Sequence, residues 1–471
     1  MFNLPGTVLI DDKEDELHEI LNSIAAAGIP CIPIQYKNAP GNKSGIDHIN
    51  LKNVKPRIII TDLNLTDSVN FNAKSLVGPI AKVLEPLTVY GPYILLFWSR
   101  NQDIVEEVVK ELTVRFHKKI NLPIHWDIIS KSQFKGKPEE LKDKIESLIK
   151  TNSLFNAISD WESRITHAAQ KTSNALYELT TPTVFEPENK TEKHQEQFIK
   201  ALALIGNETV GIKNALEQPS LAVDLGLSPL LQDQLHLSNL DENLWGSAIP
   251  LLGKQQTLDH GIKSALNTFC HLEQVEPDFP KNCRGVFIEM NDEILKTPAK
   301  RHKLEDRIGN TIEDLIHEEF LSQSKLGKLK PEADAFKEEA RKSIKLGFVE
   351  VSAICDQAQQ KTKLHQYLLA ALIPEKFEKL TEFTNSKSEV QNFSHIGIYR
   401  LPKVKINGEI YILKLTFKYQ IGTRALSNVK ERTYKNTWFG KPLFRLKDQI
   451  LSDISFKSAQ YSSRPGIIRF D

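Results

Sequence analysis

The chain has 471 residues, which is too long for one ordinary hydrophobic core and predicts about two to four domains. Its 61 lysines and arginines are matched by 60 aspartates and glutamates, so the chain as a whole is not a protein that coats a polyanion. The four cysteines include no CxxC pair and no apolar run reaches about 18 residues, which excludes the common zinc-ribbon spacings and membrane-spanning helices and leads us to expect a cytoplasmic protein.

Two apolar strands near the N-terminus end in aspartates. Residues 8–16 read VLIDDKEDE, in which three apolar residues run into Asp11 and Asp12. Residues 57–65 read RIIITDLNL, a second apolar run that ends at Asp62. Strands that are apolar throughout belong inside a parallel sheet, so each acid marks the carboxyl end of a strand, where open α/β sheets bind their ligands.

Helical stripes and further strands alternate with these two runs. An apolar stripe at residues 17–24 precedes a strand at 29–34, and a long polar loop follows. Two later strands end in a hydroxyl and an ammonium group, at Ser99 and Lys131. Repeated alternation of strand and helix, joined by right-handed crossovers, predicts a doubly wound parallel sheet over residues 1–150.

The polar groups at these strand ends suit one chemistry. Carboxylates that converge at one sheet edge repel one another unless a cation lies among them, and oxygen ligands with room for water suit Mg²⁺. If Asp62 attacks a phosphoryl donor, the new phosphate oxygens need the metal, a hydroxyl donor and a cation. Ser99 and Lys131 bring the last two groups.

In these marks the first third of the chain resembles the receiver domain of response regulators. The resemblance implies a flavodoxin-like fold whose five parallel strands have the order 2-1-3-4-5. It also implies Mg²⁺ as cofactor and a histidine kinase or another phosphodonor protein as partner. The residues implied for this chemistry are the phosphoacceptor Asp62, the metal ligands Asp11 (through water), Asp12, Asp62 and the backbone carbonyl of Asn64, and the phosphoryl-binding Ser99 and Lys131.

Three features depart from the family pattern. Ser132 follows the lysine of strand five, where receivers usually have proline. Ile128 and Ile129 stand where an aromatic switch residue is usual. Arg100 follows the hydroxyl of strand four, where a small residue is normal, and a cation there could slow the access of water to a phosphoaspartate or take over charge neutralisation.

The middle of the chain, residues 151–345, is predicted to be mainly helical. Its first helix runs for about seven turns from Ser153. Two prolines in residues 180–189, TTPTVFEPEN, indicate a linker. The HEE triplet at residues 317–319 lacks the HExxH metal spacing, so we interpret it as a solvated helix face.

The last region, residues 346–471, is predicted to be an α+β region. Its first strand delivers Glu350, Cys355 and Asp356 near the start of a helix, where a thiol could be activated, and this is the candidate site of an effector enzyme. The pair Asn407-Gly408 is the strongest hairpin signal, and residues 411–420 alternate as a half-buried strand with a partly basic face.

The same region is locally basic. Residues 401–471 contain 14 lysines and arginines against 5 acids, with aromatic residues interleaved. Such a pattern can bind single-stranded nucleic acid through phosphates and stacked bases. If nucleic acid or an acidic partner binds there, one continuous positive surface should be formed by Lys414, Lys418, Arg424, Lys430, Arg432, Lys435 and Lys441.

Three functional hypotheses follow from the sequence. The first is a phosphorelay signalling protein of the two-component type, in which a receiver controls a large output region; such fusions are similar to components of bacterial conflict and antiphage defence systems. The second is a scaffold whose non-catalytic pseudo-receiver docks a defence-system partner protein. The third is an effector enzyme or a nucleic-acid-binding module in the C-terminal half. Beyond phosphoacceptor chemistry we expect no enzymatic activity under the first two hypotheses.

Overall fold

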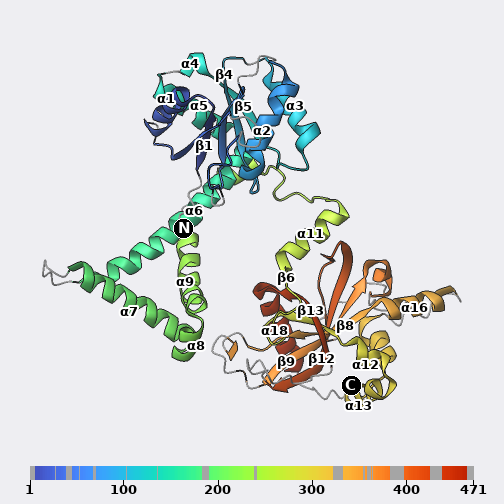
Figure 1. Ribbon diagram of the computed structural model, residues 1–471. Helices are drawn as coiled ribbons and strands as arrows, with labels where there is room; N and C mark the ends of the chain where they lie inside the picture. Colours follow the sequence, from blue (N-terminus) through green and yellow to red (C-terminus); the bar gives the residue numbers. More distant parts are fainter. Residues whose placement is uncertain are drawn as a thin grey trace. The chain divides into compact units, whose positions relative to one another are not determined.

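The computed structural model describes residues 6–463 except 27, 39–44, 52–53, 67–70, 102, 135, 183–189, 238–240, 322–331, 354–355, 358–361, 363, 382–396 and 425–437. The chain divides into two compact units, Met1–Ala175 with Leu231–Gln255, and Leu176–Leu230 with Gln256–Asp471. None of the described helices combines the length and the apolar composition that crossing a bilayer requires. Figure 1 shows the elements of both units.

Five parallel strands form the sheet of the first unit, in the order β2-β1-β3-β4-β5. The strands are β1 (Thr7–Asp11), β2 (Cys31–Gln35), β3 (Ile58–Asp62), β4 (Ile94–Ser99) and β5 (His125–Ser130). In the register of the central pairs, Ile10 lies opposite Thr61, and Asp62 lies opposite Trp98. The flavodoxin-like order predicted from the sequence is confirmed.

Helices cover both faces of this sheet. They are α1 (Glu14–Ala26), α2 (Ala73–Leu87), α3 (Val105–Phe116), the short α4 (Lys131–Phe134) and α5 (Pro138–Thr151). Along β1, Val8 and Ile10 belong to the core beneath α2 and α3, whereas Leu9 belongs to the core beneath α1 and α5. Since alternate strand residues point to opposite faces, two covered faces require strands that are apolar at every position.

The connection between β2 and β3 departs from a regular strand–helix alternation. Its described residues contain no helix, and an isolated antiparallel bridge joins Lys37 to Gly45. The side chains of Tyr36 and Ile46 are nevertheless buried in the core beneath α2 and α3. Apolar loop residues therefore help to cover a part of the sheet where a crossover helix would be expected.

A series of helices follows the first sheet. Their bounds are α6 (Ser153–Leu179), α7 (Lys190–Val210), α8 (Ile212–Glu217), α9 (Pro219–His236), α10 (Glu242–Ala248) and α11 (His260–His271). The Asn152 side chain accepts a hydrogen bond from the Phe155 amide at 2.9 Å, which caps the start of α6. Phe155 is buried in the core beneath α1 and α5, so α6 begins as part of the first unit. The middle of the predicted linker, residues 183–189, lies outside the described residues.

The second unit contains an eight-stranded antiparallel sheet in the order β10-β12-β9-β8-β7-β13-β6, with β11 paired to β12. The strands are β6 (Leu272–Gln274), β7 (Val286–Met290), β8 (Lys345–Glu350), β9 (Leu364–Pro374), β10 (Ile398–Arg400), β11 (Val404–Ile406), β12 (Glu409–Arg424) and β13 (Phe439–Leu446). Asn407 and Gly408 turn between β11 and β12 with φ values of 51° and 86°, as the hairpin signal predicts.

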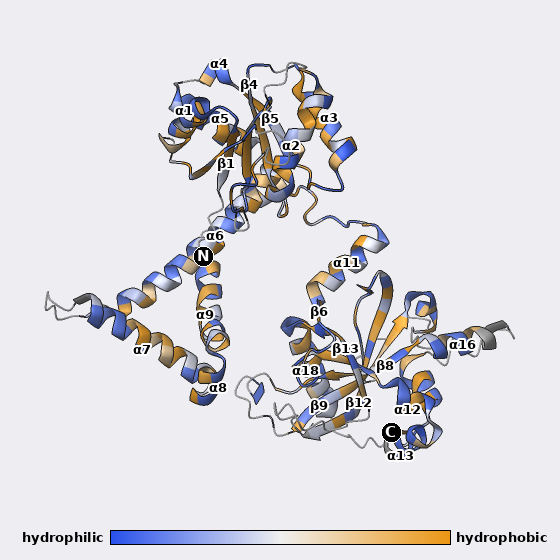
Figure 2. Cartoon of the chain, viewed as in Figure 1, coloured by the Kyte–Doolittle hydropathy of each residue, from blue (hydrophilic) through white to orange (hydrophobic). Residues whose placement is uncertain are grey.

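Both faces of this sheet are covered as well. The covering elements are α12 (Asp292–Lys296), α13 (Pro298–Ile308), α14 (Ile312–Leu315), the π-helix η3 (Ile316–Phe320), α16 (Glu332–Ser343), the 3-10 helix η4 (Glu375–Leu380) and α18 (Asp448–Ser462). Leu451 and Ile454 of α18 pack on one face, and Leu315 and Phe320 pack on the other. Figure 2 accordingly shows predominantly hydrophobic strands in both sheets.

The boundary expected at residues 345/346 does not separate the helices from the strands. The sheet takes β6 and β7 from the stretch that we expected to be mainly helical, and β8 already begins at Lys345. β6 has three residues, too few for a clear period-two pattern, and β7 is a short apolar run that periodicity alone does not distinguish from a helix.

Candidate functional site

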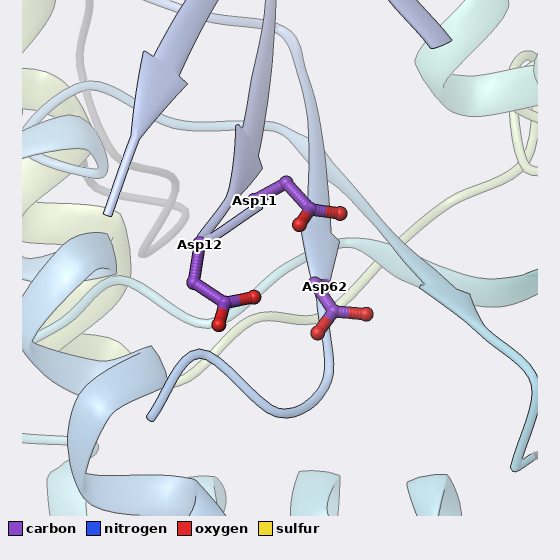
Figure 3. A group of neighbouring side chains, drawn as sticks. All are labelled: Asp11, Asp12 and Asp62. Carbon is purple, nitrogen blue, oxygen red and sulfur yellow. The ribbon is translucent and has the colours of Figure 1, made fainter. Parts of the chain in front are cut away.

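Three carboxylates meet at the carboxyl edge of the first sheet. Asp11 is the last residue of β1, Asp12 follows it, and Asp62 is the last residue of β3, the neighbouring strand. One carboxylate oxygen from each lies within 4.8 Å of the others. Figure 3 shows the three side chains around a common space at the strand ends. The structure therefore brings together the three acids that the sequence singled out.

Lys131 enters the same cluster from the end of β5. Its Nζ lies 3.1 Å from Asp11 Oδ2 and 2.7 Å from Asp62 Oδ1. The Lys131 side chain is 10% exposed and that of Asp11 is fully buried. A lysine is rarely buried to this degree unless it is paired, and here carboxylates supply the pairing.

The pKa values record the competition between burial and charge. Burial raises the pKa of Asp11 above its ordinary value, with the charge of Asp62 adding to the rise and Lys131 opposing it. Burial alone would lower the pKa of Lys131, but the charges of Asp62 and Asp11 outweigh it and hold that pKa above its ordinary value. Lys131 is therefore protonated at neutral pH, whereas the ionised form of the buried Asp11 lowers the stability of the folded state.

Asn64 follows Asp62 by two residues, and Ser99 ends β4, the strand that pairs with β3. Ser99 is buried at the end of β4, where its Oγ accepts a hydrogen bond from the Asn101 amide at 3.0 Å. The Asn64 amide donates to Asp62 Oδ2 at 3.0 Å, which fixes the orientation of that carboxylate. That Ser99 grips a phosphoryl group and that the Asn64 carbonyl binds metal both stay predictions.

A fourth acid, which the sequence reasoning missed, completes the cluster. Glu16 lies in the first turn of α1, and its Oε2 accepts a hydrogen bond from Lys131 Nζ at 2.5 Å. Its other oxygen lies 3.5 Å from Nη2 of Arg100. The available signal was its position, since Glu16 lies in the first turn of the helix that begins directly after the strand-end acids.

The residues present fit a hard divalent cation. All three grouped side chains offer carboxylate oxygens, which are the ligands that Mg²⁺ prefers, and one of them is fully buried. Burial of Asp11 beside Asp62 leaves a local excess of negative charge that Lys131 balances only in part. A cation at this edge would relieve that repulsion.

The structure describes Glu350 and Asp356 of the second candidate site but not its thiol, so the enzyme hypothesis for the second unit stays a prediction. Glu350 is fully buried; its Oε1 lies 2.9 Å from His365 Nδ1, and its Oε2 accepts from the Ser352 amide at 3.2 Å. Cys355 lies outside the described residues, and Asp356 is exposed. Both oxygens of Glu350 thus hold neighbouring strands and loop together, which is a structural role.

The predicted positive surface is wrong at Lys414. This side chain is fully buried, and its Nζ donates to the backbone carbonyls of Phe320 at 3.0 Å and Thr381 at 2.6 Å. The neighbouring Lys418 is paired with Glu319 at 2.8 Å. The polar positions Lys414 and Thr416 of β12 therefore lie in a covered part of the sheet, whereas Lys418 and Gln420 are exposed.

The interpretation of the HEE triplet as a solvated face is wrong at Glu319, whereas Glu318 is exposed. Glu319 is buried, and besides Lys418 it accepts a hydrogen bond from Thr416 Oγ1 at 2.9 Å. The π-helical turn at Ile316–Phe320 widens the helix by one residue relative to an α-helical turn. Glu319 follows Ile312 and Leu315 at helical spacing, so its burial on the same face agrees with the periodicity, and only its charge argued for solvent.

Comparisons with known proteins assign no family to this chain. No model of a protein family matches it, and neither the curated proteins nor the solved structures contain a match.

Proposed function

We propose that the first unit is a phosphoacceptor domain of the receiver type, in which Asp62 receives a phosphoryl group. The observation that carries the proposal is the position of Lys131, whose Nζ bridges Asp11 and Asp62 beside the carboxylate of Asp12. A nucleophilic carboxylate needs a nearby cation that can neutralise the entering phosphoryl oxygens.

The chemical step is a transfer to one oxygen of Asp62. A carboxylate oxygen attacks the phosphorus of the donor, a P–O bond forms to give an acyl phosphate, and the donor's P–N or P–O bond breaks with its electron pair leaving on the donor atom, which takes a proton from solvent. The hydrogen bond from the Asn64 amide holds Oδ2 of Asp62 and leaves Oδ1 toward Lys131. Lys131 would neutralise the negative charge that develops on the phosphoryl oxygens during the transfer.

A bound Mg²⁺ would supply charge neutralisation at the phosphoryl oxygens, with Asp11, Asp12 and Asp62 as the residues that hold it. The donor would be a histidine kinase, another phosphodonor protein or a small acyl or amido phosphate. The second unit would be the output region of this switch, within an antiphage defence system and with a partner protein of that system.

The test is covalent labelling of the full chain. Wild type, Asp62→Asn and Asp15→Asn are incubated with Mg²⁺ and acetyl phosphate or phosphoramidate, and intact mass is measured. We expect one added phosphoryl group in wild type and in Asp15→Asn, an exposed acid of α1 that serves as the charge-matched control, and none in Asp62→Asn. Labelling of Asp62→Asn to the wild-type level would show that the phosphoacceptor is elsewhere.

A scaffold with a non-catalytic pseudo-receiver is the second candidate, and one observation favours it. Lys131 is paired with Glu16 as well as with the strand-end acids, so its ammonium group is already in contact with carboxylates before any phosphoryl group arrives. If wild type takes up no phosphoryl group from any donor while Asp62→Asn retains full cellular activity, the scaffold function replaces the phosphoacceptor function.

A further inference from the structure

Glu16 links the two cations at the sheet edge through a single carboxylate. Oε2 lies 2.5 Å from Lys131 Nζ, and Oε1 lies 3.5 Å from Arg100 Nη2. The Glu16 side chain is 23% exposed, whereas that of Arg100 is 67% exposed. Lys131 therefore reaches Glu16 from the buried side of the pocket, and Arg100 reaches it from solvent.

The charges around the pocket leave Glu16 in conflict with a phosphoryl group. Four acids, Asp11, Asp12, Asp62 and Glu16, lie near three cations, Lys131, Lys13 and Arg100, which leaves a formal charge of −1. A divalent cation would offset that excess, and phosphorylation then replaces the single charge of Asp62 by about −1.5 to −2. The new phosphoryl oxygens need donors in direct contact, and the two nearby cations Lys131 and Arg100 are both paired with Glu16.

We propose that Glu16 is a positioning residue that holds Lys131 and Arg100 before phosphorylation and gives them up to the phosphoryl group afterwards. The inference rests on the proposed function. Arg100 suits the second role because a guanidinium group presents paired donors that match two phosphate oxygens, and because it follows Ser99 directly at the end of β4. Glu16 thereby acts as an internal competitor of the phosphoryl group.

This competition gives Glu16→Gln two opposite effects. The substitution keeps the shape of the side chain and removes its charge. It should weaken the binding of Mg²⁺ alone, since one negative charge near the three ligands is lost. It should tighten the binding of beryllofluoride in saturating Mg²⁺, since both cations are released, with each effect about three- to tenfold.

The experiment is calorimetric titration of the full chain, first with Mg²⁺ and then with beryllofluoride at saturating Mg²⁺. Glu14→Gln is the matched control, because Glu14 lies in the same first turn of α1 and is exposed. Arg100→Ala should weaken beryllofluoride binding, and it should do so more strongly in the Glu16→Gln background, where Arg100 no longer has to leave Glu16. Additive effects of the two substitutions would overturn the release of Arg100.

The outcomes separate this inference from the proposed function. If Asp62→Asn abolishes beryllofluoride binding but Glu16→Gln behaves like Glu14→Gln, or binds beryllofluoride more weakly than wild type, Glu16 is no competitor and the proposed function stands. If wild type itself binds no beryllofluoride with Mg²⁺ present, both are overturned. Circular dichroism of each variant checks that the fold is retained. Arg100→Ala changes an exposed side chain and tests the contact between Glu16 and Arg100 from the arginine side.

Discussion

Replacing Lys131 by Met should destabilise the metal-free first unit and make it depend on a divalent cation. Lys131 Nζ contacts three carboxylates at 2.5–3.1 Å, and the substitution leaves the fully buried Asp11 without its cation. Removing one partner of a buried ion pair costs about 3–5 kcal/mol. Methionine fills most of the space and avoids the desolvation of a buried ammonium group, so we expect a loss of about 2–4 kcal/mol.

Divalent cations should reverse this loss. In wild type the ammonium group repels a cation that binds to Asp11 and Asp62, so Lys131→Met should bind Mg²⁺ more tightly. A ligand at 100 times its dissociation constant stabilises the folded state by about 2.7 kcal/mol. Saturating Mg²⁺ should therefore restore most of the stability of the variant, and it should stabilise wild type by less.

Hydrogen exchange of peptides from β1 and β3, followed by mass spectrometry, measures this effect in the first unit alone. That choice matters because a chain of two units need not unfold in one step. Lys150→Met, at an exposed position of α5, is the control for loss of a lysine. The reasoning is refuted if Lys131→Met protects β1 and β3 as well as wild type does in EDTA, or if Mg²⁺ protects the two proteins equally.

Three further substitutions test other parts of the structure. Asp11→Asn should stabilise the metal-free protein by about 0.5–2 kcal/mol at pH 7. Burial and the charge of Asp62 raise the pKa of Asp11 in the folded state, so its ionised form costs stability above that pKa. The advantage of the variant should therefore shrink as the pH falls toward the ordinary carboxyl range, which hydrogen exchange at several pH values would show. Gly347→Ala should cost about 1–3 kcal/mol in denaturant unfolding of the second unit, because the added Cβ would lie 2.5 Å from the Ile288 carbonyl oxygen; an unchanged midpoint would contradict this packing. Glu350→Leu should cost about 3 kcal/mol, since it leaves His365 and the Ser352 amide without their acceptor, and a stable variant would show that the pair is not structural.

The strand-end acids could be predicted because their positions follow from short-range rules. A continuous apolar run predicts a buried parallel strand, and the first polar residue after it lies at the carboxyl edge whatever the rest of the chain does. Asp11 obeys that rule, Asp62 and Lys131 follow one residue later, after Thr61 and Ser130, and the order of strands brings the three together. The contact of Glu16 with Lys131 was not predictable to the same degree, because it depends on the rotamers of two long side chains.

The burial of polar groups in the second unit could not be predicted from the sequence, for a different reason. Lys414 looks like a surface cation when only its own strand is considered. Its acceptors are the carbonyls of Phe320 and Thr381, which are distant in sequence and come from turns that no periodicity marks. The same holds for His365, which meets Glu350 only because β9 pairs with β8. Long-range pairing of this kind decides burial, and local sequence does not encode it.

One strand of the first unit joins the candidate site to the start of α6. Asp62 ends β3, and Arg57 precedes the first residue of the same strand. The Arg57 guanidinium group pairs with both carboxylate oxygens of Glu162 on α6, at 2.8 and 2.5 Å, and donates to the Pro92 carbonyl at 3.1 Å.

These contacts make α6 a fixed extension of the sheet over its first turns. A bidentate pair with a planar guanidinium group constrains orientation as well as distance, and Phe155 adds a buried apolar anchor. Under the proposed function, a change of charge at Asp62 acts on the strand whose opposite end holds α6. A long helix that is anchored at that end is a suitable element to carry such a change away from the sheet, and it gives the proposed switch a physical connection that the acidic cluster alone would lack.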